Sequence, residues 1–156
     1  MNALIQYQSD KASAAQIAGH VRLCDSDFVP PLSGRVEIVD YANKIAAKAT
    51  RFEAWVENIL IGLVAVYCND PSKNMAYITS VSVLKEWAGK GIATCLLGKC
   101  VEHAKVLGIR EITLEVAQNN EPAIRLYRKS GFTDGKATGR ALCMNLIVKS
   151  GEDYEQ

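Results

Sequence analysis

A glycine-bearing turn ahead of an amphipathic stretch is the part of this sequence best suited to chemistry. Gly89 and Gly91 stand directly before Ile92, Leu96, Leu97 and Cys100, which recur at helical spacing. Glycine has no Cβ, so the backbone here can approach a ligand closely and point successive N–H groups at one spot. A helix that begins there adds the positive end of its dipole. The turn therefore predicts a cradle for phosphate groups, formed by Gly89, Lys90, Gly91, Ile92, Ala93 and Thr94.

Two other phosphate-binding motifs do not fit this turn. A Walker A loop ends in Gly-Lys-Ser/Thr, whereas Lys90 precedes the second glycine and no such string follows it. A dinucleotide-binding fingerprint needs three glycines, and Thr94 stands where the third would be. The turn therefore predicts phosphate binding outside these two classes.

A second block follows the cradle by about thirty residues, and it reads Asn120-Glu-Pro-Ala-Ile-Arg-Leu-Tyr-Arg-Lys-Ser-Gly-Phe132. Together the two blocks resemble the GNAT superfamily of acyl-CoA-dependent N-acyltransferases. In that family Gln/Arg-x-x-Gly-x-Gly/Ala precedes Asn-x-x-Ala-x-x-Leu-Tyr-x-x-x-Gly-Phe. Here Ala88 stands where the family usually has Arg or Gln. The resemblance covers roughly residues 50 to 146.

The resemblance implies a mixed α+β fold, with a twisted, mostly antiparallel sheet of about six or seven strands and about four helices. Two strands, ending near Leu84 and Val116, are expected to run parallel and to splay apart. The wedge between them would take the pantetheine arm of acetyl-CoA, which pairs with the backbone at Val81, Ser82 and Val83. The implied activity is acetyl transfer from acetyl-CoA to a primary amine by direct attack on the thioester, an acyltransferase reaction of class EC 2.3.1.

The resemblance also implies roles for two residues of the second block. Tyr127 holds the position of the general acid that donates a proton to the departing CoA thiolate. Its alternative role is packing on the cofactor or the core. Asn120 either hydrogen-bonds the cofactor arm or caps the following helix.

The sequence does not determine which group removes the proton from the amine. A primary amine with a pKa of about 10 must lose a proton before it can attack a thioester. Many members of the resembled family carry a glutamate at the position of Tyr77, and this chain has no carboxylate there. Glu115 is the best remaining candidate, with a solvated or cross-strand role as its alternative, and Glu53 comes next. Tyr77 or Thr79 could instead hold a water that relays the proton.

The acceptor is the least determined part of the prediction, because the fold does not select it. The resemblance places acceptor-binding parts at residues 28–35 and 134–140. Neither segment is densely acidic, which disfavours polyamines and histone tails. We expect a small polar or anionic amine, such as an aminosugar or a nucleotide-linked aminosugar. The candidate acceptor contacts are Phe28, Arg35, Tyr67, Tyr77 and Thr79.

Two alternative functions remain open. The chain could acetylate protein N-termini or lysines, which binding of short peptides would reveal. It could also bind acetyl-CoA without transferring from it, as a sensor. The missing glutamate at Tyr77 and the presence of Ala88 favour the sensor, whereas Tyr127 in its full motif favours catalysis.

Hydrophobic periodicity supplies the elements that position these groups. Helices are expected at 10–24 and 35–48, the second with Val36, Val39, Ala42 and Ala46 along one face. A hairpin is expected at 51–67, followed by a turn at 69–74 and a strand at 75–84. Beyond the cradle we expect a helix to Gly108, a strand at 111–116, a helix from Pro122 to Gly131, and last strands at Phe132 and 141–148 joined by a polar loop at 134–139.

The bulk composition fits a small enzyme. The 156 residues suit one domain, expected at 1–150, with a frayed tail at 151–156. A net charge of +1 with interspersed signs predicts no nucleic-acid or membrane partner, and no apolar run approaches a membrane span of about 20 residues. Five cysteines without a C-x-x-C pair indicate reduced thiols of a cytoplasmic protein, and the two histidines lack zinc spacing, so no metal is expected. We expect a monomer or a homodimer.

Overall fold

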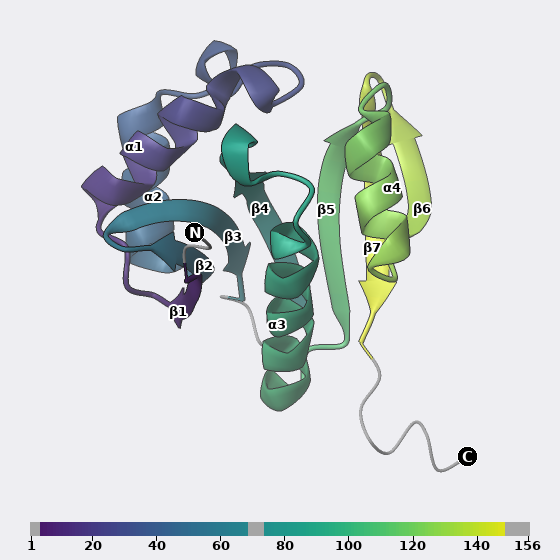
Figure 1. Ribbon diagram of the computed structural model, residues 1–156. Coiled ribbons are helices and arrows are strands. Elements are labelled where there is room, and N and C mark those ends of the chain that lie inside the picture. The colour runs from purple at the N-terminus through teal and green to yellow at the C-terminus, as the bar shows by residue number, and fades with distance from the viewer. Residues whose placement is uncertain (1–3, 69–73, 149–156) are drawn as a thin grey trace.

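The computed structural model describes residues 4–68 and 74–148. The tail expected at 151–156 and nearly all of the turn expected at 69–74 lie outside these residues. The helices are α1 Ala14–Cys24, α2 Ile38–Lys48, α3 Ile92–Leu107 and α4 Glu121–Lys129. The strands are β1 Gln6–Ser9, β2 Thr50–Val56, β3 Ile59–Tyr67, β4 Met75–Val83, β5 Glu111–Ala117, β6 Thr133–Thr138 and β7 Ala141–Ile147 (Figure 1).

Within the described residues the strands form one seven-stranded sheet in the order β1-β2-β3-β4-β5-β7-β6. All neighbouring pairs are antiparallel except β4 and β5, which run parallel. The parallel pairing is short, because it joins only Met75 to Glu111, Ala76 to Ile112 and Tyr77 to Thr113. Beyond Tyr77 the two strands part, as Figure 1 shows. The predicted fold class, with its splayed parallel pair, is confirmed.

A bulge in β4 exchanges the faces of the strand at the point where it leaves β5. Ser80 lies opposite Ala65 but Ile78 lies opposite Val66, so Thr79 is an extra residue in β4. Before the bulge, Ile78 belongs to the larger of two core clusters, and after it Val81 packs against that cluster. Ser80 and Ser82 therefore point to the opposite face of the sheet.

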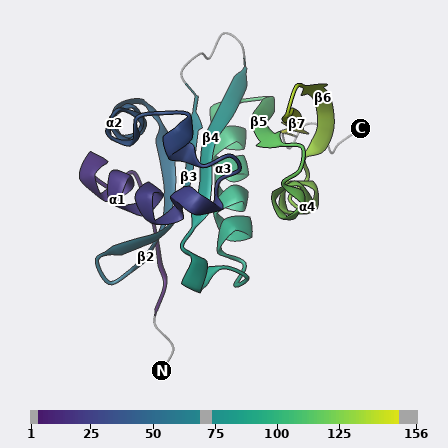
Figure 2. The same ribbon diagram turned by 90° about the horizontal axis from the view of Figure 1, so that it is seen from above.

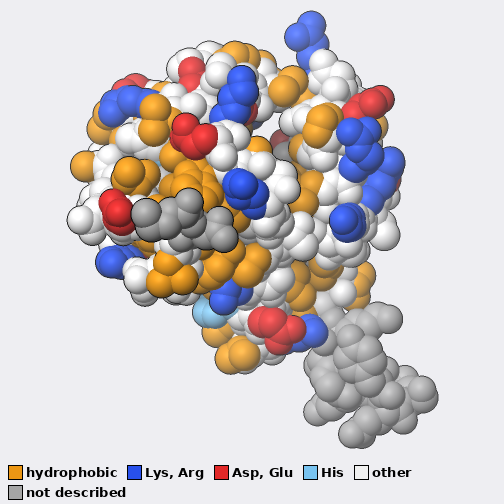
Figure 3. Space-filling view, viewed as in Figure 1, with side chains coloured by type: hydrophobic (Ala, Val, Ile, Leu, Met, Phe, Trp, Pro, Cys, Tyr) orange, Lys and Arg blue, Asp and Glu red, His pale blue; other side chains and the backbone are white. Residues whose placement is uncertain are grey.

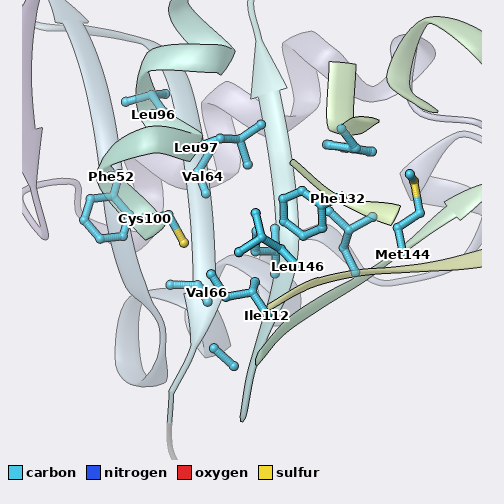
Figure 4. Close-up of a cluster of buried hydrophobic side chains, with 14 of the residues drawn as sticks. Phe52, Val64, Val66, Leu96, Leu97, Cys100, Ile112, Phe132, Met144 and Leu146 are labelled. Carbon is cyan, nitrogen blue, oxygen red and sulfur yellow. The ribbon is translucent and has the colours of Figure 1, made fainter. Parts of the chain in front are cut away.

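The core consists of two layers, one on each face of the sheet. The larger cluster lies between the sheet and helices α3 and α4, and Figure 4 shows part of it around Val64, Ile112 and Phe132. Ile92, Leu96, Leu97 and Cys100 of α3 are buried there, as their spacing predicted. The smaller cluster lies under α1 and α2, which cover the other face in the N-terminal half (Figure 2).

The N-terminal segment differs from its prediction. The first helix begins at Ala14, not Asp10, because Ser13 and Gln16 form a reciprocal capping box. The preceding residues are extended, and the unpredicted strand β1 pairs with β2. All four residues of β1 are exposed. Such a strand has no buried face, so it leaves no alternation in the sequence to detect.

Two further predictions of local structure are wrong. Helix α2 begins at Ile38 and buries Ala42 and Ile45, whereas Val39 is exposed. The segment 134–139 is not a loop, since Thr133–Thr138 forms β6 and pairs with β7. Every residue of β6 is exposed, so its polar composition resembled that of a loop.

The structure also bears on the cysteines, on membrane spans and on metal ligands. The five cysteines are free thiols. None of the described helices is long and apolar enough to cross a membrane. The described residues also contain no group of three or more His, Cys, Asp or Glu side chains that could hold a metal ion.

Candidate active site

A cavity of about 1070 Å³ opens where β4 and β5 part. The loop between α1 and α2, the start of α3, the start of α4 and the β6–β7 turn complete its wall. Figure 3 shows the surface hollowed between the two halves of the molecule. The predicted site residues that line the cavity are Phe28, Arg35, Tyr77, Thr79, Val81, Ser82, Val83, Gly89, Gly91, Ile92, Ala93, Thr94, Glu115, Asn120 and Tyr127.

Three predicted site residues lie elsewhere, namely Lys90, Tyr67 and the candidate base Glu53, whose contacts are described below. Lys90 is exposed and is not part of the cavity wall, although its glycine neighbours are. Tyr67 packs against the smaller core cluster, and Lys44 Nζ lies 5.3 Å from the centre of its ring. Tyr67 in β3 and Tyr77 in β4 are cross-strand partners, but only Tyr77 lines the cavity. Sequence spacing alone could not distinguish the two tyrosines.

The glycine turn has the geometry of an anion cradle. Gly89 and Gly91 have φ values of +78° and +80°, in the left-handed region that favours glycine. Gly91 is the N-cap of α3, and the first backbone bond of the helix runs from Cys95 N to Gly91 O at 3.0 Å. The N–H groups of Ile92, Ala93 and Thr94 precede this bond and have no acceptor within the helix, and all three residues line the cavity. These donors and the helix dipole suit a phosphate.

The edge of β4 that faces the cavity suits an extended ligand. Its other edge pairs with β3 up to Val83, and Leu84 N continues this pairing to Ile61 O at 2.8 Å. Toward β5 the pairing ends at Tyr77, so the following backbone groups of β4 face the cavity. An extended amide-bearing chain can bind there as an added strand.

Tyr127 lies on the α4 side of the cavity. Its side chain is buried and meets Phe132 edge to face, with ring centroids 6.0 Å apart. Burial raises the pKa of Tyr127 to about 12, so the hydroxyl keeps its proton at neutral pH and can act as a donor. Asn120 Oδ1 accepts a bond from Ala123 N at 3.4 Å, so it caps α4, and Asn120 also lines the cavity.

Charged and phenolic groups gather on the opposite side. In β5, Leu114 and Val116 belong to the larger core cluster, so Glu115 points to the opposite face of the sheet. Burial raises the pKa of Tyr77, Glu115 raises it further, and Arg35 opposes this by lowering it. Glu115 and Arg35 therefore both lie near Tyr77 in the cavity wall.

Tyr41 was missed by the sequence reasoning. Its hydroxyl donates to the carbonyl of Thr79 at 2.7 Å, and the side chain lines the cavity. This bond ties α2 to the bulge in β4. The one available signal was the position of Tyr41 one residue before Ala42, which the sequence placed on the inward face of the helix.

Glu53, the second candidate base, has a structural role instead. Its side chain is fully buried and outside the cavity. The carboxylate accepts bonds from Lys11 N at 3.1 Å, Ala12 N at 3.0 Å, Arg51 Nε at 3.2 Å and Trp55 Nε1 at 3.0 Å. These contacts join β1 and α1 to β2. Both oxygens of the carboxylate are thus engaged outside the cavity wall, so Glu53 is not placed to act as the base.

A buried polar pair, His20 and Ser82, joins α1 to β4. His20 Nδ1 lies 2.9 Å from Leu60 O, and its Nε2 lies 2.8 Å from Ser82 Oγ. A carbonyl can only accept, so Nδ1 carries the proton and the Ser82 hydroxyl donates to Nε2. Burial lowers the pKa of His20, which keeps the ring neutral.

Comparisons with known proteins agree with this geometry. The model of the acetyltransferase (GNAT) family matches residues 16–132. N-alpha-acetyltransferase 30 of Schizosaccharomyces pombe is 39% identical over 56 residues, which are 36% of this chain and 37% of that protein. The first curated relatives are matched over only 34% to 37% of their own length.

Two solved structures have the same fold. The PaiA N-acetyltransferase of Thermoplasma acidophilum, in complex with coenzyme A, has a TM-score of 0.71 at 18% identity, covering 92% of this chain and 99% of that chain. The ribosomal-protein-S18-alanine N-acetyltransferase of Escherichia coli has a TM-score of 0.75 at 18% identity, covering 96% and 98%.

Proposed function

The chain belongs to the acetyltransferase (GNAT) family, and from this premise we propose that it transfers an acetyl group from acetyl-CoA to a primary amine. One observation carries the proposal. The unpaired edge of β4 leads along a single cavity to the glycine turn at the start of α3. An edge that binds an extended arm and a cradle that binds phosphates are the two features that acetyl-CoA requires.

The residues present fit this substrate. The pyrophosphate would accept hydrogen bonds from the N–H groups that follow Gly89 and Gly91. A Cβ built on either glycine meets no atom within 4 Å, so the cradle has free space for a ligand. The pantetheine arm would pair with β4 between Val81 and Val83. The absence of an arginine at Ala88 removes no backbone donor from the cradle.

In the proposed reaction the amine loses a proton, attacks the thioester carbonyl, and the C–S bond breaks. Among the residues that line the cavity, Asp27 and Glu115 carry carboxylates. Glu115 belongs to β5 and lies near Tyr77 in the cavity wall. We propose that Glu115 accepts the proton of the amine, directly or through a water. Tyr77 stays protonated because its pKa is raised, so it acts as a donor that orients and not as the base.

Tyr127 is proposed to assist departure of the CoA thiolate. Negative charge develops on the sulfur as the C–S bond breaks, and a protonated hydroxyl beside it stabilises that charge. Tyr127 belongs to α4 and Glu115 to β5, and both line the cavity. The donor to the sulfur and the base for the amine would therefore approach the reacting groups from different sides.

We propose a small polar amine as the acceptor, in line with the mixed charges of the cavity wall. A protein N-terminus is the second candidate. It is favoured by the relative from Schizosaccharomyces pombe and the structure from Escherichia coli, whose names describe N-alpha and S18-alanine acetyltransferases.

The proposal is tested by following thiol release from acetyl-CoA with a panel of aminosugars, nucleotide-linked aminosugars, polyamines, amino acids and peptides. Transfer predicts thiol release that depends on one class of amine. A chain that binds acetyl-CoA without transferring it would gain melting temperature from acetyl-CoA and release no thiol with any amine.

A further inference from the structure

Two side chains of opposite charge, Glu115 and Arg35, line the cavity together with the phenol of Tyr77. Glu115 belongs to β5, whereas Arg35 follows the 3-10 helix Leu32–Gly34 that precedes α2. The pKa of Tyr77 is raised by Glu115 and lowered by Arg35, so both charges lie close enough to act on its hydroxyl. A ligand in this part of the cavity meets an anion and a cation together.

The loop that carries Arg35 is held in place without using its guanidinium. Arg35 N donates to Leu32 O at 2.9 Å, and the side chain of Leu32 is buried in the smaller core cluster. The Asp25 carboxylate accepts bonds from both the N–H and the hydroxyl of Ser33, each at 2.7 Å. This carboxylate is therefore occupied within the loop.

The guanidinium of Arg35 is available to a ligand. Among the ion pairs formed within residues 4–68 and 74–148, none includes Arg35. Arginine presents a planar set of N–H donors that matches a carboxylate or a phosphate in two parallel bonds. A cationic group on an acceptor would instead be repelled there.

We infer that the acceptor is an amine that carries an anionic group, a carboxylate or a phosphate, and that Arg35 binds this group while the amine lies toward Glu115. This inference rests on the acetyl transfer proposed above and specifies its substrate class. It makes Arg35 a specificity-determining residue. It also excludes polyamines, whose second cation would face the guanidinium.

The other cations of the cavity wall are less suited to this role. Lys129 belongs to α4, the helix that carries Tyr127, and so lies on the side of the departing thiol. Arg140 lies in the β6–β7 turn, where its carbonyl accepts a bond from Gln118 N at 2.8 Å. Neither is among the groups that shift the pKa of Tyr77.

The test compares acceptors in matched pairs. Alanine is paired with alaninamide, and glucosamine 6-phosphate with glucosamine, and kcat/KM is measured from thiol release at saturating acetyl-CoA. Hydrogen bonds to a charged group contribute about 1.5 to 3 kcal/mol, so we expect a preference of about 10- to 150-fold for the anionic member. The pair that shows this preference identifies the anion as carboxylate or phosphate.

Arg35→Gln tests the residue itself. The variant is expected to lose about 10- to 150-fold in kcat/KM with the anionic acceptor and less than about 3-fold with its neutral partner, with the KM for acetyl-CoA unchanged. Arg22→Gln is the matched control, because Arg22 is exposed in the last turn of α1 and outside the cavity wall. It is expected to behave as the wild type.

Equal kcat/KM within both pairs, or a preference that survives in Arg35→Gln, would overturn the inference and leave acetyl transfer standing. Turnover of neutral amines alone would do the same. Absence of thiol release with every amine, with no rise in melting temperature from acetyl-CoA, would overturn acetyl transfer itself and the inference that rests on it.

Discussion

Replacing Tyr127 with phenylalanine removes one hydroxyl from the proposed site and little else. Phenylalanine keeps the buried ring and its edge-to-face contact with Phe132 at 6.0 Å, so the fold should be retained. The variant therefore isolates what the hydroxyl contributes to the departure of the thiol.

The size of that contribution follows from the pKa. Burial raises the pKa of Tyr127 to about 12, whereas an ordinary thiol has a pKa of about 8.5. Complete proton transfer to the thiolate is then uphill by about 3.5 pKa units, or roughly 5 kcal/mol. The hydroxyl must act chiefly as a hydrogen-bond donor to the developing charge. Such a bond contributes about 1.5 to 3 kcal/mol, which predicts a loss of about 10- to 150-fold in kcat.

The assay is steady-state thiol release with both substrates varied. We expect the loss to lie in kcat, with the KM for acetyl-CoA changed by less than about 3-fold. Tyr67→Phe is the matched control, because Tyr67 lies outside the cavity wall and should keep full turnover. Turnover of Tyr127→Phe within about 2-fold of wild type would refute the role of the hydroxyl. An alkaline decline below pH 9 that this variant abolishes would refute the raised pKa.

Three further results are expected. Gly91→Ala should destabilise the protein by about 1 kcal/mol, because φ is +80°, and weaken acetyl-CoA binding measured by calorimetry, whereas Gly98→Ala within α3 should do neither. Glu115→Gln should lower kcat/KM by about 100-fold or more in the thiol assay. Unaltered turnover would show that Glu115 is not the base and that a water without this carboxylate accepts the proton of the amine. Burial lowers the pKa of His20, so the unfolded chain binds more protons, and stability should fall as the pH drops below about 6.5. Denaturant midpoints across this range test it, and His20→Gln should lose that component.

The features that could be predicted from sequence are those with local causes. Gly91 adopts a positive φ that favours glycine, and Asn120 with Pro122 begins α4 by capping and by a preset φ. The hairpin of β2 and β3 turns at Glu57 and Asn58 because two apolar runs meet there. Each signal lies within a few residues of the structure it determines, so one sequence is enough to read it.

The features that were missed depend on distant contacts. Glu53 looked like a free carboxylate, but partners about forty residues away, at Lys11 and Ala12, bury it. The bulge at Thr79 and its bond from Tyr41 appear only when β4 pairs with β3 and α2 packs above them. The charges of Arg35 and Glu115 come together through the same packing, eighty positions apart in the sequence.

The central claim is that the cavity between β4 and β5 moves an acetyl group from acetyl-CoA to an amine. The most direct measurement is the mass of the acceptor after reaction with acetyl-CoA carrying a carbon-13 acetyl group, together with the thiol released. Acetyl transfer predicts one labelled acetyl group on the amine for each thiol. Thiol release at the same rate without an amine, or a thiol yield with no labelled product, would contradict it.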